Sequence, residues 1–250
     1  MCAEPRTDDW VVVDIGHSRI KWARVRDGAL EPATIGRAAT DEPDSLFDAL
    51  EKLACPRALI SGQSRPESVA RISRRLQQAR ARVDIITTGD RSMPVQPAYR
   101  SLGCDRWLAL QKPGGEEAGA FVVVDSGTAI TIDVVDAGGR HRGGWIMPGI
   151  AAARSGLFAR APGLNRPLPE AEDADRPARD TGRALARGGL MLAAGGIDRA
   201  VRAAERAVDD QVSLWLTGGN AAELLALLER RARQDQHLVL HGLAMATRLT

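Results

Sequence analysis

The chain has 250 residues, of which 44% are hydrophobic and 26% charged, as in ordinary globular proteins. Lysine and arginine number 34 against 32 acidic residues, so net charge gives no argument for binding nucleic acid or a membrane, and we expect neither partner. No segment approaches the roughly 20 consecutive apolar residues of a membrane span. The length fits one large domain or two of ordinary size.

The cysteines and the start of the chain indicate a reducing compartment. Cys2, Cys55 and Cys104 are odd in number and widely spaced, and they show no zinc-binding pattern. The opening "MCAEPRTDDW" lacks the apolar core of a signal peptide. We therefore expect a cytoplasmic protein.

The first half of the chain predicts three strands followed by alternating helices and strands. Residues 10–15 form a buried strand that turns at Gly16 into a second strand, which runs to about residue 25. The elements expected next are a strand near 29–35, a helix over 44–54, a strand over 57–61, a helix over 66–81 and a strand over 83–88. A proline-containing loop then leads to "YRSLGCDRWLALQK", whose latter part is predicted to be helical.

The second half repeats this plan after a linker candidate, "PGGEEAG", at residues 113–119, where glycine favours loop structure. The elements expected in order are strands over 121–125, 129–135 and 140–147, a helix from about 149, an exposed loop over 161–180, a helix over 181–208, a strand and glycine turn over 213–219, and a helix over 221–234.

A short motif connects the two halves. "VVVDIG" at residues 11–16 matches "VVVDSG" at 122–127, an offset of 111 residues. A meander that feeds βα units gives a mixed sheet. The pattern predicts an α/β chain of two similar lobes, 1–117 and 118–250, each with a mixed sheet flanked by helices and with a cleft between them. Chance similarity is the alternative, because valine-rich strands that end in Asp and Gly are common.

The two matching turns suit phosphate binding. A glycine turn lets backbone N–H groups approach a phosphate, and the hydroxyl of Ser18 or Thr128 can donate as well. Asp14 and Asp125 can each hold a cation that offsets phosphate charge. The P-loop, dinucleotide-binding, zinc-protease and α/β-hydrolase motifs are all missing from the sequence, which favours two opposed phosphate turns around one polyphosphate.

Two further motifs carry possible chemistry. In "WLTGGNAAELL", the backbone of Gly218 and Gly219 could lie against an adenine or ribose, or the stretch is a tight turn with Asn220 as the helix cap. In "LGCDRW", Asp105 could serve as a base beside an acceptor hydroxyl. The alternative is that Asp105 forms a surface ion pair or caps a helix next to Arg106.

With these motifs assembled, the chain resembles the type III pantothenate kinases. This family belongs to the acetate and sugar kinase, heat-shock 70 and actin superfamily, whose two lobes are ribonuclease H-like. The resemblance rests on "DIGHSRIK", "GCDR", "DSGTAITID", "GGWIMPGI" and "TGGNA", which occur in family order along nearly the whole chain.

The resemblance implies ATP-dependent phosphorylation of pantothenate to 4′-phosphopantothenate, the first step of coenzyme A biosynthesis, in a homodimer. Asp105 would be the general base. The residues that would bind pantothenate are Tyr99, Gly103, Cys104, Asp105, Arg106 and Thr181. Those that would bind ATP are Asp14, Ile15, Gly16, His17, Ser18, Arg19, Ile20, Lys21, Thr128, Gly218 and Gly219. Asp14 would hold Mg²⁺ through water, and Asp125 a monovalent cation, K⁺ or NH₄⁺.

One residue departs from the family pattern. The first phosphate motif usually has asparagine where this chain has His17. Histidine also carries an N–H donor, so phosphate contact can persist. The alternatives are a catalytically weak or inactive member that acts as a transcriptional accessory protein, and a kinase of the same superfamily for another small alcohol or sugar.

Overall fold

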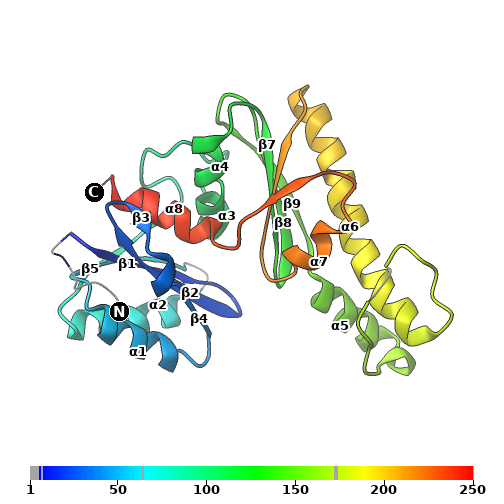
Figure 1. Cartoon of the computed structure of the whole chain (residues 1–250), viewed down its shortest axis with the longest axis horizontal. Coiled ribbons are helices and arrows are strands. Elements are labelled where there is room, and N and C mark those ends of the chain that lie inside the picture. The colour runs from blue at the N-terminus through cyan, green and yellow to red at the C-terminus, as the bar shows by residue number, and fades with distance from the viewer. Residues whose placement is uncertain (1–5, 7, 63–64, 172–173, 250) are drawn as a thin grey trace. The chain divides into compact units, whose positions relative to one another are not determined.

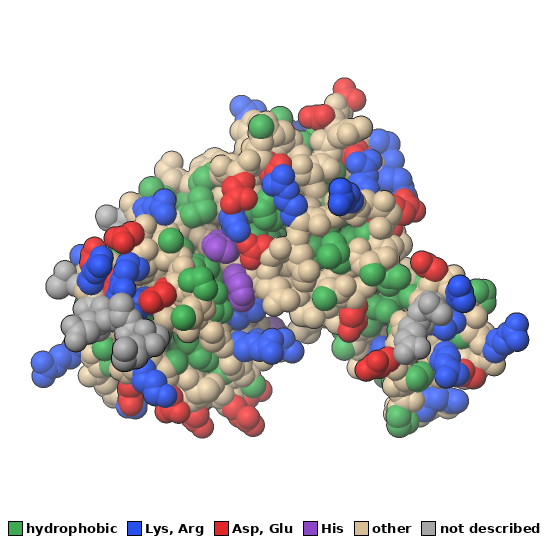
Figure 2. Space-filling view, in the orientation of Figure 1, with side chains coloured by type: hydrophobic (Ala, Val, Ile, Leu, Met, Phe, Trp, Pro, Cys, Tyr) green, Lys and Arg blue, Asp and Glu red, His purple; other side chains and the backbone are tan. Residues whose placement is uncertain are grey.

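The computed structural model describes residues 6, 8–62, 65–171 and 174–249, so Cys2 lies outside the described residues. The chain divides into two compact units. The first comprises Met1–Glu116 together with His237–Thr250, and the second comprises Glu117–Gln236. None of the helices formed by described residues has the length and hydropathy of a membrane span. Acidic and basic side chains are interspersed over the face seen in Figure 2, in keeping with the net charge of +2.

A mixed sheet forms the centre of the first unit. Its strands are β1 (Trp10–Ile15), β2 (Arg19–Arg26), β3 (Ala29–Leu30), β4 (Gly36–Ala39), β5 (Arg57–Ser61) and β6 (Arg82–Ile85). Their order is β3-β2-β1-β5-β6, and β4 also pairs with β2. β1 is antiparallel to β2 and parallel to β5, and all six of its residues are buried. A strand covered on both faces needs such a continuous apolar run.

Helices cover both faces of this sheet (Figure 1). The helices of the first unit are α1 (Asp44–Leu53), α2 (Pro66–Gln78), α3 (Cys104–Ala109), α4 (Gln111–Glu116) and α8 (Leu238–Thr247). Apolar residues of α1 and α2, such as Leu46 and Ile72, pack against Val11, Val13 and Ile15 of β1. The other face of β1 is contacted by α8, which also packs against α3.

The second unit contains a mixed sheet of the same design. Its strands are β7 (Phe121–Ser126), β8 (Ala129–Val135), β9 (His141–Pro148), β10 (Ser213–Thr217) and β11 (Ala232–Gln234), in the order β11-β10-β7-β8-β9. β7, β8 and β9 form an antiparallel meander, and β10 runs parallel to β7. The predicted repeat is therefore confirmed at the level of topology, and so is the α/β fold with two similar lobes.

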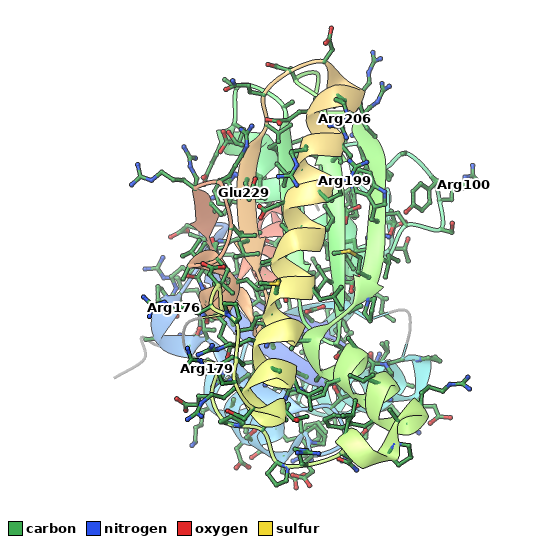
Figure 3. All side chains as sticks on the ribbon, turned by 90° about the vertical axis from the view of Figure 1, so that its right-hand side faces the viewer. Arg100, Arg176, Arg179, Arg199, Arg206 and Glu229 are labelled. Atoms are coloured by element: carbon green, nitrogen blue, oxygen red, sulfur yellow. The ribbon has the colours of Figure 1, made fainter. Side chains whose placement is uncertain are left out.

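One long helix covers the second sheet. The helices of this unit are α5 (Ile150–Arg160), α6 (Thr181–Val208) and α7 (Ala221–Leu225). Leu190, Ile197 and Val201 of α6 pack with Val122 and Val124 of β7 in one core. Figure 3 shows α6 lying along the sheet, with the exposed residues Arg199 and Arg206 on its outer side. The helix predicted over 181–208 is confirmed with its bounds.

Four predicted segments differ in the structure. The strand expected over 29–35 is the short β3, then a 3-10 turn over Pro32–Thr34, then β4. The strand expected to reach residue 88 ends at Ile85. The helix expected over 221–234 stops at Leu225, and residues 232–234 form β11 instead. The predicted linker, 113–119, begins inside α4.

The chain crosses between units twice, which the predicted boundaries did not include. The expected second lobe ran to residue 250, whereas His237–Thr250 belongs to the first unit. The reason is the packing of α8 on β1 and α3. Gly242 allows this close approach, because a Cβ atom there would clash with the backbone of Leu108.

Candidate active site

A tight turn joins β1 to β2 in the first unit. The N–H of Gly16 donates to the carbonyl oxygen of Arg19 at 3.0 Å, which leaves His17 and Ser18 exposed at the tip. A Cβ atom at residue 16 would lie only 2.9 Å from that oxygen, so the turn favours glycine. The turn therefore presents backbone and polar side chains, as the sequence predicts for a phosphate-binding loop.

Polar residues form a row across the sheet just behind this turn. Asp14 of β1 is paired with Lys21 of β2 on one side and with Ser61 of β5 on the other, and Lys21 is paired in turn with Arg37 of β4. Residues paired across a sheet have side chains on the same face. The cationic side chains of Lys21 and Arg37 thus lie next to each other on neighbouring strands, which is unfavourable unless negative charge lies nearby.

The carboxylate of Asp14 is held by a buried hydroxyl. Ser61 Oγ donates to Asp14 Oδ1 at 2.8 Å, with Ser61 fully buried and Asp14 7% exposed. The next residue, Gly62, has a φ of +144° and passes so close to Ile15 that a Cβ atom would lie 2.7 Å from the Cβ of Ile15. β5 and the residue after it therefore position the end of β1.

The second unit has a corresponding turn between β7 and β8. The N–H of Gly127 donates to the carbonyl oxygen of Ala129 at 2.9 Å, and Thr128 is exposed at the tip. The N–H of Gly149, which precedes α5, donates to the Thr128 carbonyl oxygen at 3.1 Å. A Cβ atom at residue 149 would clash with the backbone of this turn, so the "GGWIMPGI" segment supports it at close range.

The glycine turn after β10 lies directly against Asp125. Thr217 is paired with Asp125, and a Cβ atom at Gly218 would lie 2.5 Å from Asp125 Oδ1. Gly218 has a φ of +97°, which side chains rarely adopt. The N–H of Asn220 donates to the Ser126 carbonyl oxygen at 3.1 Å. The structure thus brings together Asp125, Thr128 and the Gly218–Gly219 turn, which the sequence places far apart.

The repeat extends to this supporting segment. Ser61-Gly62 follows β5 as Thr217-Gly218 follows β10, and both glycines have positive φ. Each hydroxyl residue is paired with the aspartate that is the next-to-last residue of β1 or β7. Each unit therefore contains an aspartate, a hydroxyl residue on the neighbouring parallel strand and a glycine that permits close backbone contact.

The acceptor motif forms the start of α3 in the first unit. Asp105 is exposed in the first turn of α3, and its Oδ1 accepts a hydrogen bond from the Arg106 N–H at 2.8 Å. A Cβ atom at Gly103 would lie 2.6 Å from the same carboxylate oxygen. A larger residue at 103 would therefore displace the carboxylate of Asp105.

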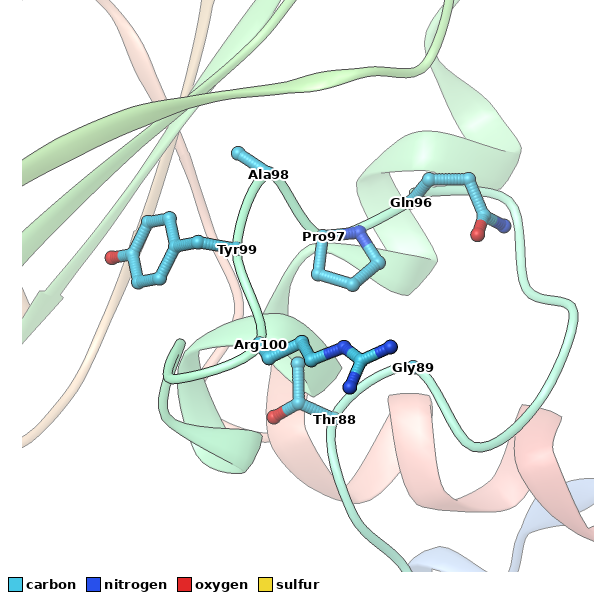
Figure 4. Close-up of a pocket in the computed structure, with 7 residues that line it drawn as sticks. All are labelled: Thr88, Gly89, Gln96, Pro97, Ala98, Tyr99 and Arg100. Carbon is cyan, nitrogen blue, oxygen red and sulfur yellow. The ribbon is translucent and has the colours of Figure 1, made fainter.

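Arg106 and Tyr99 are brought together beside a pocket. Arg106 Nη1 donates to the Tyr99 hydroxyl at 3.3 Å. Tyr99 is 40% exposed and lines an open cavity of about 420 Å³ (Figure 4). The other lining residues are Thr88, Gly89, Gln96, Pro97, Ala98 and Arg100. Thr88 Oγ1 donates to the Leu102 carbonyl oxygen at 2.7 Å, which fixes the pocket wall to the acceptor motif.

The pKa of the Cys104 thiol is raised by burial and by nearby carboxylates. Burial raises the pKa of Cys104 to about 12, and the carboxylates of Asp105, Asp14 and Asp90 add to this increase. The side chain is 4% exposed and its Sγ contacts the Ile86 carbonyl oxygen at 3.5 Å, so only the backbone of Cys104 is suited to contact a substrate.

Several predicted site residues have buried side chains. Ile15 and Ile20 pack in the core between the first sheet and its helices, so these side chains anchor the turn.

The predicted site residue Thr181 is exposed at the first helical position of α6 in the second unit. The preceding residue, Asp180, caps this helix by accepting the Arg183 N–H at 2.9 Å.

Comparison with known proteins identifies the family. The family model for type III pantothenate kinase matches residues 10–203. The type III pantothenate kinase of Nitrosococcus oceani is 32% identical, with 96% of this chain and 94% of the relative aligned. That of Alkalilimnicola ehrlichii is 35% identical, covering 96% of this chain and 98% of the relative. The chain belongs to the type III pantothenate kinase family.

Solved structures support the fold assigned to this family member. A protein from Sinorhizobium meliloti assigned as a 2-dehydro-3-deoxygalactonokinase aligns with a TM-score of 0.58 and 16% identity, over 96% of this chain and 98% of its own. One from Campylobacter jejuni assigned as a Baf family transcriptional activator aligns with a TM-score of 0.57 and 21% identity, over 93% and 94% of the two chains.

Sequence reasoning did not find four residues that support these turns. Ser61 and Arg37 are recognised only once the strand register is known. Gly149 lies within the "GGWIMPGI" motif, but its contact with the Thr128 backbone is not evident from spacing. Arg65 contacts His17 from the start of α2. For Ser61, the sequence does contain a signal: a hydroxyl residue followed by glycine occurs after a strand in both halves, in "LISG" and in "WLTG".

Proposed function

We propose that this member of the type III pantothenate kinase family transfers the γ-phosphoryl group of ATP to the 4′-hydroxyl of pantothenate. The observation that supports the proposal is the buried Asp14 carboxylate, which Ser61 Oγ bonds at 2.8 Å just behind an exposed glycine turn, in the same unit as the exposed Asp105. The names of the relatives favour a kinase over the regulatory alternative.

Asp105 acts as the general base in this proposal. Its carboxylate accepts the proton of the pantothenate hydroxyl while that oxygen forms a bond to the γ-phosphorus. The bond from this phosphorus to the β–γ bridging oxygen breaks, and ADP leaves. The exposed position of Asp105 in the first turn of α3 suits this role. Phosphoryl transfer otherwise depends on positioning and charge stabilisation.

Arg106 and Tyr99 are suited to bind the other end of the acceptor. A guanidinium pairs well with a carboxylate such as that of pantothenate. The hydrogen bond between these two side chains orients the guanidinium beside the 420 Å³ cavity. The residues that line the pocket and Asp105 belong to one stretch of chain, residues 88–105.

The two glycine turns contribute to ATP binding. Asp14 fits Mg²⁺, which is usually held through one or two carboxylates, waters and the substrate phosphates. Lys21 stands beside Asp14 and offsets phosphate charge. Asp125, partly exposed at the end of β7, provides an oxygen ligand for the monovalent cation, and the Gly218–Gly219 turn contacts the adenosine.

The working form is proposed to be a homodimer. Met191 and Leu192 on α6 are 55% and 63% exposed, and Trp145 and Ile146 on the edge strand β9 are 41% and 65% exposed. Contiguous patches of exposed apolar side chains often mark sites of protein–protein interaction.

The reaction is assigned to the cytoplasm, where ATP is available and thiols stay reduced. Recovery of the native chain from a membrane or secreted fraction would contradict that location.

The direct test incubates the purified chain with ATP, Mg²⁺ and pantothenate, and measures the product by mass spectrometry. Parallel reactions contain K⁺, NH₄⁺, Na⁺ or no added monovalent cation. We expect 4′-phosphopantothenate and ADP in equal amounts, with higher rates in K⁺ or NH₄⁺. Formation of no phosphopantothenate under any of these conditions would refute the proposed activity, and phosphorylation of a sugar instead would favour another kinase of the superfamily.

A further inference from the structure

Arg65 contacts the tip of the first phosphate turn from outside the predicted motifs. It stands immediately before α2, and its Nη2 donates to the His17 carbonyl oxygen at 2.6 Å. The same nitrogen lies 3.4 Å from Nδ1 of the His17 ring. One side chain thus contacts both the backbone and the imidazole at the position where the family motif usually has asparagine.

The approach of Arg65 follows from the support that β5 gives to the turn. Ser61 bonds the Asp14 carboxylate, and Gly62 packs against Ile15. The N–H of Arg65 then donates to the Gly62 carbonyl oxygen at 3.0 Å. Arg65 is therefore bonded to the residue that packs against the end of β1.

The contact favours one tautomer of a neutral His17 ring. A guanidinium only donates hydrogen bonds, so Nδ1 of His17 must act as the acceptor in this pair. In a neutral imidazole the other nitrogen, Nε2, then holds the hydrogen and becomes a donor. Like the NH₂ group of an asparagine side chain, this N–H can donate a hydrogen bond.

Arg65 also brings a positive charge to the turn. Both contacts use Nη2, so among the described residues Nη1 has no hydrogen-bond acceptor. Arg19 at the turn is exposed, and Lys21 and Arg37 lie in the polar row behind it. Four cationic side chains around one exposed turn suit a polyanion better than a neutral ligand.

We propose that Arg65 and His17 form a phosphate-binding pair, in which His17 Nε2–H and the Arg65 guanidinium donate to a phosphate oxygen of ATP. This inference rests on the proposed function of the turn as an ATP site. It assigns a role to a residue that none of the motifs includes, and it explains how the chain accommodates histidine at this position.

A double-mutant cycle tests the pair. Arg65→Ala, His17→Ala and the double variant are compared with the unchanged chain by calorimetric titration with ATP and Mg²⁺. Each single substitution should raise the ATP dissociation constant roughly tenfold, because each removes a charged or oriented donor. The double variant should be weakened by less than the product of the two single effects, since the residues act together. Independent effects that multiply, or no effect of Arg65→Ala, would overturn the proposal.

Arg74→Ala is the matched control, because Arg74 lies on α2, the helix that follows Arg65, and among the described residues its side chain bonds only the carbonyl oxygen of Ala70, at 3.3 Å. It should leave ATP affinity unchanged. Circular dichroism and thermal unfolding of every variant exclude misfolding as the cause. Equal weakening by Arg74→Ala would show a general effect of charge, which also contradicts a specific pair.

Nitrogen NMR of the imidazole rings provides a readout that a purely structural role would not change. The chain has four histidines, so the His17 signals are assigned by their loss in His17→Ala. We expect the Nε2-protonated form in the unchanged chain and a mixture of forms in Arg65→Ala. A mixture in the unchanged chain would overturn the proposal. ATP titration and NMR need no pantothenate, so they remain decisive even if the pantothenate assay fails.

Discussion

Asp14 shows how much of a site is determined by neighbours that the motif does not contain. Its carboxylate accepts a hydrogen bond from Ser61, and the residue after Asp14, Ile15, packs against Gly62. Asp125 has the corresponding neighbours Thr217 and Gly218. Because a side chain held by a neighbouring strand loses little further freedom when a ligand binds, such support favours a preorganised site.

Asp105 is the residue on which turnover should depend most. Asp105→Asn removes the proton acceptor but keeps the shape of the side chain and its contact with the Arg106 N–H. We expect kcat to fall by about 10²–10⁴-fold while ATP affinity stays unchanged, as loss of a general base predicts. Steady-state kinetics and calorimetric titration measure the two quantities.

The matched control for this prediction is Asp90→Asn. Asp90 also influences Cys104, but its Oδ2 accepts the Thr87 N–H at 2.6 Å in a neighbouring loop. This variant should retain nearly full turnover. If Asp105→Asn lost ATP binding to the same extent as turnover, Asp105 would have a binding role in place of the catalytic one.

Among the elements, the strands and long helices were predictable because their patterns are local. "WVVVDI" and "FVVVDS" are continuous apolar runs, and the structure buries both at the centre of a sheet. The helix over Thr181–Val208 has apolar residues at helical spacing and a capping aspartate before it. The site motifs at the ends of these strands could be located for the same reason.

The elements that could not be predicted depend on distant partners. The segment 221–234 has the composition of a helix, yet residues 232–234 pair with β10 as an edge strand. Arg233 lies over the ring of Trp215 and donates to Glu117 Oε1 at 2.8 Å, so tertiary contacts override local preference. In the first unit, Thr34 Oγ1 accepts the Arg24 N–H at 2.8 Å, and a 3-10 turn therefore replaces the expected strand.

The exposed apolar residues of α6 provide a test of the proposed dimer. Replacing both Met191 and Leu192 with Asp should prevent association, because charges would have to be buried in the interface. Sedimentation velocity should show twice the mass of one chain for the unchanged protein and a single chain for the double variant. Leu249→Asp is the control, since Leu249 is also 49% exposed but belongs to the first unit.

The dimer proposal would be contradicted by an unchanged protein that sediments as a monomer at micromolar concentration. Association that persists in the double variant would show that another surface forms the interface.

At the scale of the whole molecule, two features stand out: the same sheet topology occurs in both units, and the first unit consists of two separate stretches of chain. Both units place an aspartate at the end of the central strand of a mixed sheet, followed by a glycine turn. The return of α8 to the first unit could not be predicted, because its apolar residues would suit a core in either unit. Gly242 gives the physical reason, since α8 fits closely against α3 only without a side chain there.

The central claim is that both repeated turns take part in binding the phosphates of ATP. Calorimetric titration of ATP with Mg²⁺ and K⁺ into the unchanged chain, Asp14→Asn and Asp125→Asn tests it most directly. We predict one ATP per chain and an affinity that falls at least about tenfold in each variant, since each loses a charged oxygen ligand. ATP binding of unchanged strength in either correctly folded variant would contradict the claim.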